Sequence, residues 1–598
     1  MPANLYLRSL GVIIFLWSIV FALGMAISYI ISFYYGEVLP PSMIILLPVI
    51  VAFLVVGIQF IVSPWIMDLM IGWIFNATKY NVNDLPPHIR DFLYNHMQSH
   101  NFSLKYVVII HDNNPNAFTF GHTKKNARMA ITEGILKYLN EEEQLAVVAH
   151  ECGHIIHRDF IWMTVAAAIP LICYSFYQGL WTLARTRSSS DDEAGKVGFI
   201  ALVLAIISWI VYLLSHFVVL ILSRIREYYA DKHSAGATGQ PGALSRALVK
   251  IAYGIIQAEA QRSEIMADKD RYSVAARRRA ARQAGFIQGV SPLGIFDIKT
   301  ARSLSNSGFG RGITDLDEDT IIKAASWDLS NPWGSFLEKF STHPLPAKRI
   351  RAMNELQVQY HQQPEFPRLG KVTLPESLWD EFFVDIFLIY IAPWLVIILP
   401  VIGGYLAVLR GYNPLIGAGL GFLIFAVVWK WRRHEKYPKI RDSDPVNTVV
   451  QCLTDMTKNS YYEASPLRGK SAVFEGRLVG RGTPGYLFSE DLVLQDDTGI
   501  ITLDYSPLLA FMSWFFAIFK VPKLMGKRVK VYGWYHRVPG PVLSVWKIVT
   551  PEGKTFKNRW SGLNWFIMWL FILLGLVLIA VGVGEVTISD LGITSFLP

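Results

Sequence analysis

The chain has 598 residues, of which 52% are hydrophobic and 17% are charged, and its mean hydropathy is +0.32. Soluble globular domains carry about a quarter charged residues, so this composition excludes an ordinary soluble protein. The three cysteines are odd in number and far apart, which excludes a disulfide framework and a cysteine metal site. The net charge of +9 is more typical of membrane topology than of nucleic-acid binding.

Seven uncharged windows are predicted to span a membrane, because each holds roughly the 20 apolar residues that cross a bilayer core. The first is too long for a signal peptide and lacks a small-residue cleavage site, so we expect it to remain as an anchor. A further apolar stretch, 505–519, is too short to cross and is interpreted as an interfacial or re-entrant segment or a hydrophobic loop. The seven windows are 9–36, 38–67, 160–184, 197–223, 386–409, 411–429 and 560–584.

The distribution of lysine and arginine predicts the orientation, since these residues stay in the cytoplasm when they lie near membrane ends. Residues 430–442 carry six of them, whereas the loop around Glu37 and the tail after Gly584 carry none. With 430–442 inside a cell membrane, seven crossings place the 185–196 loop and the C-terminus outside. The parts predicted to be cytoplasmic are the N-terminus, 68–159, 224–385 and 430–559.

Residues 445–559 differ from the rest because they hold five short β-rich runs separated by glycine and proline turns. Five short strands within about 100 residues predict a small antiparallel barrel, and an OB-like barrel fits best. Basic and aromatic residues do not alternate densely here, and fold alone does not define function, so we interpret the barrel as a structural or regulatory module. The runs are Val473–Val479, Leu492–Gln495, Ile500–Asp504, Val529–Tyr535 and Val542–Val549.

The predicted fold is a mainly α membrane protein with about seven transmembrane helices, a cytoplasmic α+β domain and a C-terminal OB-like β-barrel. Within the α+β domain, Lys105–Ile110 is typical of a strand and 224–385 is mainly helical. The predicted parts are two transmembrane helices in 1–67, the α+β domain in 68–385 interrupted by helices 160–184 and 197–223, a transmembrane hairpin in 386–429, the barrel in 445–559 and a final transmembrane helix in 560–584.

The string His150-Glu151-Cys152-Gly153-His154 lies on a predicted helix that starts at the N-cap Asn140 and runs on towards the third window. Two histidines four residues apart project from one face, within reach of one ion. Glu151 is turned about 100° away, so it can act as a general base without occupying the coordination sphere. A catalytic zinc ion needs a third protein ligand and one open position.

Glu227 is the predicted third ligand, because two membrane helices form a hairpin that returns the chain to the face it left after His154. Asp231, one turn further on, is suited to accept a hydrogen bond from a ligating histidine. His157 lies seven residues after His150 and is the alternative third ligand, although an interface or supporting role fits it better. Asp159 is expected to cap or pair structurally near Arg158.

Two other residues, His216 and Cys152, could have a functional role. His216, in the middle of the fourth window, is either functional or bonded to a carbonyl of a neighbouring helix. Cys152 is disfavoured as a redox sensor because it points away from the ligand face.

These motifs together resemble the HtpX-like and CAAX prenyl protease type I family of integral-membrane zinc metallopeptidases, which are of the gluzincin type. The resemblance covers about 100–355 and does not reach 430–598, so the barrel and the final crossing depart from simpler members. The matching pieces are Asn116-Ala117-Phe118, Ile131-Thr132-Glu133-Gly134-Ile135-Leu136, His150-Glu151-x-x-His154 with Asp159, Ser223-Arg224-x-x-Glu227-x-x-Ala230-Asp231, and Thr342-His343-Pro344 with Arg349.

The resemblance implies a zincin-type catalytic domain with one zinc ion per chain, held by His150, His154 and Glu227. It implies Glu151 as the base and a substrate strand laid beside Asn116–Phe120. The substrate-binding residues expected from it are Asn116, Ala117 and Phe118, and the residues expected to steady the developing oxyanion are His343 or Arg349.

The predicted function is that of a zinc-dependent endopeptidase that cuts membrane or membrane-proximal polypeptides in protein quality control. Its expected partners are polypeptide substrates and the lipid bilayer, with no nucleic acid. A protease for prenylated or other specific peptides is the alternative. A non-catalytic scaffold or transporter with a structural zinc site belongs to another class, which is disfavoured because the windows lack acidic and basic residues and repeats.

Overall fold

The computed structural model describes most of the chain and divides it into two compact units. The first unit comprises 1–258, 286–300 and 336–367, and the second comprises 259–285, 301–335 and 368–598. The described residues are 14, 18, 41–74, 77–186, 192–267, 272–278, 280, 318–370, 376–457, 461–481, 491–505, 516–538, 540–558 and 560–584.

Six helices among the described residues are long and apolar enough to cross a membrane. They overlap six of the seven predicted windows and confirm a multi-pass membrane protein. The window 9–36 lies outside the described residues apart from positions 14 and 18, as does most of 505–519. The six candidate spans are Val56–Trp73, Asp159–Arg185, Gly195–Thr238, Trp379–Leu409, Pro414–Lys436 and Gly562–Val583.

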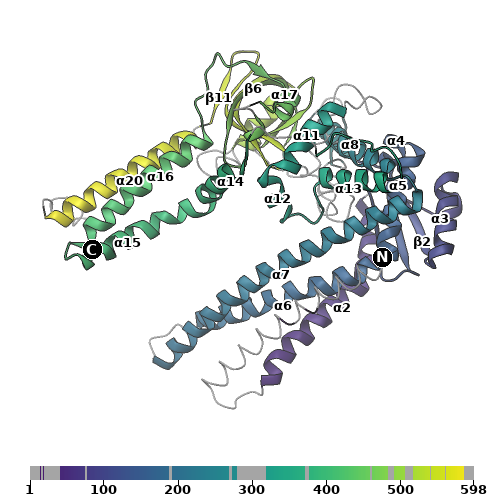
Figure 1. Ribbon diagram of the computed structural model, residues 1–598, viewed down its shortest axis with the longest axis horizontal. Helices are drawn as coiled ribbons and strands as arrows, with labels where there is room; N and C mark the ends of the chain where they lie inside the picture. Colours follow the sequence, from purple (N-terminus) through teal and green to yellow (C-terminus); the bar gives the residue numbers. More distant parts are fainter. Residues whose placement is uncertain are drawn as a thin grey trace. The chain divides into compact units, whose positions relative to one another are not determined.

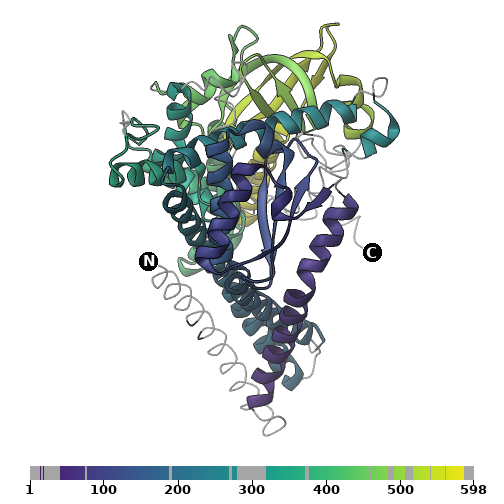
Figure 2. The same cartoon turned by 90° about the vertical axis from the view of Figure 1, so that its right-hand side faces the viewer.

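In the first unit, helices α6 (Asp159–Thr186) and α7 (Asp192–Thr238) pair along their lengths as a hairpin, and α2 (Pro41–Ile74) packs on α6 (Figures 1 and 2). An apolar cluster that includes Phe176 of α6 and Leu204 of α7 holds the pair together. Helix α7 has 47 residues and so is about 70 Å long, more than twice the thickness of a bilayer core. It therefore extends well past the predicted window 197–223.

A four-stranded sheet lies next to these helices in the first unit, with the order β1-β2-β4-β3. Strands β2 and β4 are parallel, and the other pairs are antiparallel. The expected strand Lys105–Ile110 is confirmed as β2, whereas β3 forms an edge of the sheet. The strands are β1 (Ala77–Tyr80), β2 (Leu104–Ile110), β3 (Ala117–Gly121) and β4 (Ala127–Thr132).

The motif helix α5 (Glu141–Ile156) begins as predicted and ends earlier than predicted. The Asn140 side chain accepts a hydrogen bond from the Glu143 backbone N–H, and the Glu143 carboxylate accepts one from the Asn140 backbone N–H, which forms a capping box. The expectation that this helix runs on towards the third window is wrong. Arg158 has a φ of +60°, which turns the chain so that α6 starts afresh at Asp159.

The remaining helices in the described part of 224–385 confirm that this part is mainly helical. Several of them pack in the second unit, where Trp327 Nε1 donates to the Ala464 carbonyl and Arg537 donates to the Ala324 carbonyl. Besides α5 and the hairpin, the helices that the structure describes between residues 77 and 367 include η1 (Val82–Asp84), α3 (Pro87–His100), α4 (Glu133–Tyr138), α8 (Pro241–Ala267), α11 (Glu318–Ser330), α12 (Pro332–Glu338) and α13 (Pro346–Gln359).

The second unit contains a closed five-stranded β-barrel, and the five predicted runs are confirmed as its strands. Each strand pairs with two others in the cyclic order β6-β7-β8-β10-β9. The prediction of an antiparallel barrel is wrong for one of these pairs, because β8 and β10 are parallel. Two further short strands, β5 (Val446–Asn447) and β11 (Thr555–Lys557), extend the sheet. The barrel strands are β6 (Lys470–Arg481), β7 (Leu492–Gln495), β8 (Ile500–Asp504), β9 (Arg528–Arg537) and β10 (Pro541–Val549).

Three membrane helices belong to the second unit, and α16 packs against both of the others (Figure 1). A Cβ atom at Gly417 would overlap the Gly403 carbonyl oxygen, so these backbones touch directly. The second unit's described helices are α14 (Trp379–Ile386), η4 (Phe387–Ile391), η5 (Ala392–Trp394), α15 (Leu395–Leu409), α16 (Pro414–Lys436), α17 (Val449–Thr454), η6 (Tyr461–Glu463), α19 (Val521–Leu524) and α20 (Trp560–Val583).

Candidate active site

His150 and His154 of α5 converge with Glu227 of α7 in the first unit. The two Nε2 atoms are 3.2 Å apart. Glu227 Oε2 lies 3.6 Å from His150 Nε2, and Glu227 Oε1 lies 3.6 Å from His154 Nε2. The structure thus brings together the three residues that the sequence singled out as metal ligands, and their donor atoms lie within 4.8 Å of one another.

This donor set fits a zinc ion. With Zn–N bonds of about 2.05 Å, two nitrogens of a tetrahedral site lie about 3.3 Å apart, close to the observed separation of the two imidazoles. Two imidazoles and one carboxylate leave a coordination position open, as catalytic zinc requires. Burial lowers the pKa of His154, but the hydrogen bond that its imidazole donates to Asp159 and the charge of Glu227 more than offset this and raise the pKa to about 9. The site therefore favours added positive charge.

Two aspartates contact the far nitrogens of the histidines. Asp231 Oδ1 lies 2.9 Å from His150 Nδ1, the kind of contact predicted for it. Asp159 Oδ2 accepts a hydrogen bond of 2.6 Å from His154 Nδ1, and its Oδ1 lies 2.6 Å from Arg226 Nη2. Asp159 was expected to act near Arg158, so its contact with His154 went unrecognised. Its position five residues after His154 was the available signal.

His343 and Arg349 approach the site from the segment that follows α12. Arg349 binds Asp231 through two nitrogens, at 2.9 and 2.6 Å, and its Nη1 lies 3.6 Å from Glu227 Oε2. Although burial acts against its charge, Asp231 and Glu227 raise the pKa of Arg349. His343 Nδ1 lies 3.2 Å from Glu227 Oε2. Both side chains are buried, at 3% and 0% exposure, and both contact the acidic residues of the site.

Arg224 anchors the segment that carries His343. Its Nη1 donates to the carbonyl oxygens at the end of α12 and just beyond it, those of Glu338 at 2.8 Å, Lys339 at 3.3 Å and Ser341 at 2.8 Å. The last residues of a helix leave carbonyl oxygens unpaired, and one guanidinium satisfies several of them here. The Ser223-Arg224 part of the sequence motif thus positions the His343 segment against α7.

Glu151 lies between the ligand set and edge strand β3. The Thr119 hydroxyl hydrogen-bonds to its carboxylate, and burial raises the pKa of Glu151 although both histidines oppose the shift. Phe118 and Phe120 pack into an apolar cluster with Ile71 of α2. Side chains alternate along a strand, so Thr119 points to the opposite face, towards α5.

The residues predicted to bind substrate lie on or next to β3. The Asn116 backbone is held by Thr132, which bonds both its N–H, at 2.8 Å, and its carbonyl, at 3.0 Å. Ala117 is buried at the start of β3. Because the Phe118 side chain is part of the apolar core, this residue can offer a peptide only its backbone.

The other residues with open interpretations lie apart from the ligand set. The ring of His157 lies 5.8 Å from that of His233 and 6.2 Å from that of Tyr229, and burial lowers its pKa to about 4. His216 is exposed on α7, with its ring 6.3 Å from Tyr212. Cys152 is a buried free thiol whose pKa is raised by burial, so it is not activated for redox chemistry.

Comparison with known proteins places this site in a family. The sequence profile of peptidase family M48 matches residues 87–357. A protein named Protease HtpX homolog from Methanothermobacter thermautotrophicus is 47% identical over 137 residues, which cover 23% of this chain and 48% of the relative. Protease HtpX from Legionella pneumophila strain Corby is 32% identical over 206 residues, which cover 34% of this chain and 70% of the relative.

Among solved structures, the crystal structure of S. mikatae Ste24p matches with a TM-score of 0.31 and 14% identity, over 59% of this chain and 67% of that one. The chain spans about half the length of the Methanothermobacter relative. A His-His-Glu ligand set whose glutamate lies on the candidate membrane helix α7 is the arrangement of a membrane-bound zinc metallopeptidase. The sequence identity of the chain to the Legionella protease extends over 70% of that protein. The chain therefore belongs to peptidase family M48, with the HtpX homologues.

Proposed function

We propose that the protein is an endopeptidase that hydrolyses peptide bonds of membrane or membrane-proximal proteins and that it serves protein quality control. The observation that carries the proposal is the position of Glu151, buried between the ligand set and an edge strand through its contact with Thr119. A structural zinc site has no use for such a carboxylate, which argues against a non-catalytic scaffold. The resemblance to HtpX-like peptidases supports the role in quality control.

In the proposed mechanism, His150, His154 and Glu227 hold one zinc ion, which when bound supplies a Lewis acid that polarises the scissile carbonyl and acidifies water. Glu151 takes the proton from the attacking water and passes it to the leaving amine. A carboxylate whose pKa is raised by burial is better matched to both proton transfers near neutral pH than an ordinary glutamate.

The surrounding charged residues have positioning roles in this proposal. Asp231 and Asp159 each fix one histidine through its far nitrogen, so that both Nε2 atoms face Glu227. Arg349 is committed to Asp231 by two hydrogen bonds, and we propose that it holds Asp231 and Glu227 in place. His343 remains the candidate for steadying the developing oxyanion.

We propose that the substrate binds as an extended strand beside β3, with the backbones of Asn116, Ala117 and Phe118 as its main contacts. In the described part of the chain, β3 pairs with β4 on one side and ends the sheet on the other. An edge strand presents unpaired backbone groups that bind an extended peptide with little dependence on its sequence. Such recognition suits a protease that must cut many unfolded proteins.

The proposal extends to the domain organisation and the membrane topology of the chain. The five barrel strands close with the third and fifth strands parallel, which supports an OB-like barrel in 445–559. We propose that 68–385 is the peptidase domain, followed by the membrane hairpin 386–429 and, after the barrel, by the last span 560–584. Peptidase domain and barrel lie in the cytoplasm in this topology, and the C-terminus lies outside.

The proposed function is tested by comparing membranes of cells that carry wild-type protein or Glu151→Gln. Quantitative proteomics of new N-termini should find fragments of many membrane proteins that depend on wild-type protein, and more of them after heat stress. A single lipid-modified peptide as the main product would favour the prenylated-peptide alternative. Identical sets of fragments in the two membranes would refute the enzyme's proposed role.

A further inference from the structure

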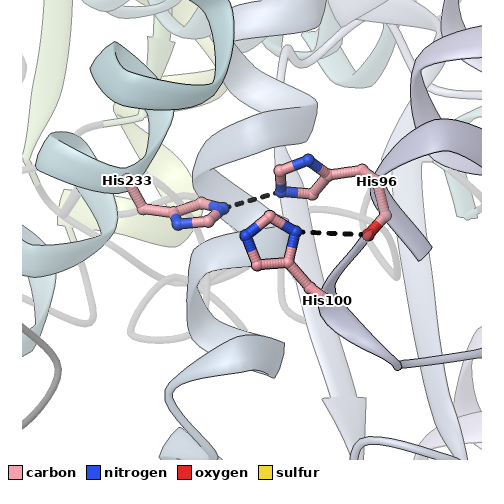
Figure 3. Close-up of side chains that lie close together, drawn as sticks. All are labelled: His96, His100 and His233. Carbon is pink, nitrogen blue, oxygen red and sulfur yellow. Dashed lines mark hydrogen bonds between the residues drawn. The ribbon is translucent and has the colours of Figure 1, made fainter. Parts of the chain in front are cut away.

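A second group of histidines lies in the first unit, apart from the proposed zinc ligands. His96 and His100 stand one turn apart on α3, and His233 comes from the end of α7 (Figure 3). Histidines at positions i and i+4 of a helix project from the same face. None of the three belongs to the HtpX-like motifs, and the cluster shares no residue with His150, His154 and Glu227.

The three rings face one another closely. His96 Nε2 lies 2.8 Å from His233 Nε2, and one ring nitrogen of each histidine lies within 4.8 Å of those of the other two. The ring centroids are 4.3 Å apart for His96 and His100, 5.0 Å for His96 and His233, and 5.4 Å for His100 and His233. Small rotations would bring three nitrogens to the separation of about 3.3 Å that a tetrahedral ion requires.

The surroundings hold the rings in place for such an ion. The Nδ1 of His100 lies 3.0 Å from Ser99 Oγ and 3.3 Å from the His96 carbonyl oxygen, and Figure 3 shows its other nitrogen turned towards the two partner rings. A contact between the far nitrogen and a carbonyl oxygen is how proteins fix the tautomer of a ligating histidine. His96 is 7% exposed and stacks on Phe92, with ring centroids 5.0 Å apart.

The chemistry of the donors selects the ion. Three imidazoles without a carboxylate suit zinc, copper and nickel, whereas calcium and magnesium prefer oxygen ligands. Because His100 is exposed, an ion can enter from solvent and keep a water molecule as its fourth ligand. We propose that His96, His100 and His233 form a second metal site, which binds one divalent transition-metal ion such as Zn²⁺ and ties α3 to α7.

The site also has a connection to the catalytic helices. A Cβ atom at Gly153 would lie 3.2 Å from the Cβ of His233. Helix α5 therefore packs closely against His233 at Gly153, which lies between the proposed zinc ligands His150 and His154. Glu227 and Asp231 lie a few residues before His233 on the same helix. An ion that ties α7 to α3 therefore stabilises the part of α7 that carries the third catalytic ligand.

The test uses full-length protein in detergent, purified with a tag that contains no histidine. Bound zinc is measured by mass spectrometry after equilibration with buffers of defined free Zn²⁺ up to the micromolar range. Wild type should bind two ions per chain at the highest free zinc and one at the lowest. His100→Ala should bind one ion throughout and keep wild-type cleavage of casein at low zinc, while His434→Ala, a control at another exposed histidine, should bind two.

A second pair of variants separates the two sites. Glu227→Ala should keep one ion at micromolar zinc, and the double variant Glu227→Ala/His100→Ala should lose it. Zinc should also raise the thermal midpoint of Glu227→Ala but not of the double variant, because only a bound ion stabilises the folded state. A wild type that saturates at one ion, or a His100→Ala variant that matches wild type in stoichiometry, would overturn the second site and leave the catalytic site unaffected.

Discussion

Four buried carboxylates surround the two imidazoles of the candidate zinc site, and each is distinguished by the group it contacts. Glu227 faces both Nε2 atoms, whereas Asp231 and Asp159 contact the far nitrogens. Glu151 contacts Thr119 of the edge strand instead. The four carboxylates therefore differ at this site in the groups that they contact.

The role of Glu151 is tested by Glu151→Gln. The amide keeps the size of the side chain but cannot accept the proton from water, and general-base help is typically worth about 10²–10⁴ in rate. Casein cleavage in detergent should fall at least about a hundredfold, or about 2.7 kcal/mol of transition-state stabilisation. Zinc content and thermal midpoint should stay close to wild type. Cleavage at the wild-type rate would assign the activity to another site or to a contaminant.

The contact between Asp159 and His154 predicts an effect on zinc affinity. Asp159→Asn removes the charge that makes His154 a stronger ligand, and the loss of such a partner typically weakens metal binding about 10–100-fold. Competition with a chromophoric chelator measures this affinity. Glu143→Gln is the matched control, because Glu143 is another buried carboxylate, on α5, but pairs with Lys250 and Arg246. It should lower the thermal midpoint and leave zinc affinity unchanged, and equal zinc affinities in both variants would contradict the assignment.

The convergence of His150, His154 and Glu227 could be predicted from the sequence because it depends on helical spacing and on the return of a membrane hairpin. The contact of Asp159 with His154 depends instead on Arg158 at a φ of +60°. Non-glycine residues rarely adopt this conformation, and no local pattern signals it. The contacts of Arg349 with Asp231 and Glu227 could not be predicted from the sequence either, since they depend on how a distant segment packs on α7.

At the scale of elements, the barrel strands were predictable and the sheet beside the active site mostly was not. Runs such as Leu492–Gln495 are short, β-rich and bounded by turn residues, and their ends agree with β7. Strand β4 (Ala127–Thr132) is buried along its whole length and shows no alternation, and β1 (Ala77–Tyr80) is short and polar. Neither carries the period that identifies a strand from sequence.

The close contact of α15 and α16 predicts that Gly417→Ala destabilises the protein. The new methyl group would overlap the Gly403 carbonyl oxygen, and overpacking of this kind typically costs about 1–3 kcal/mol. Gly179→Ala in α6 is the matched control, because no atom lies within 4 Å of a Cβ built there. It should raise stability by about 0.5–1 kcal/mol, since alanine favours helix. Thermal unfolding in detergent measures both, and equal midpoints would refute the backbone contact.

At the scale of the molecule, both compact units carry their own candidate membrane helices. The first unit holds the zinc site at the ends of α5 and α7, and the second holds the barrel with α15, α16 and α20. Helix α11, within the predicted peptidase domain 68–385, packs against α17 of the barrel unit. The sequence does not show this division, because the parts of 224–385 that belong to the first and to the second unit have the same helical pattern.

The positive-inside distribution leads to the last prediction, which concerns topology. Reporter fusions after Asp442 should be cytoplasmic, because the six basic residues of 430–442 directly follow the predicted membrane window 411–429 and resist translocation. Fusions at Pro598 and within 185–196 should be external, since an odd number of crossings separates each from that cluster. Replacing the six basic residues with glutamine should weaken the preference at Asp442. A cytoplasmic reporter at Pro598 would mean that 560–584 does not cross, while the zinc site would be unaffected because its ligands lie in the first unit.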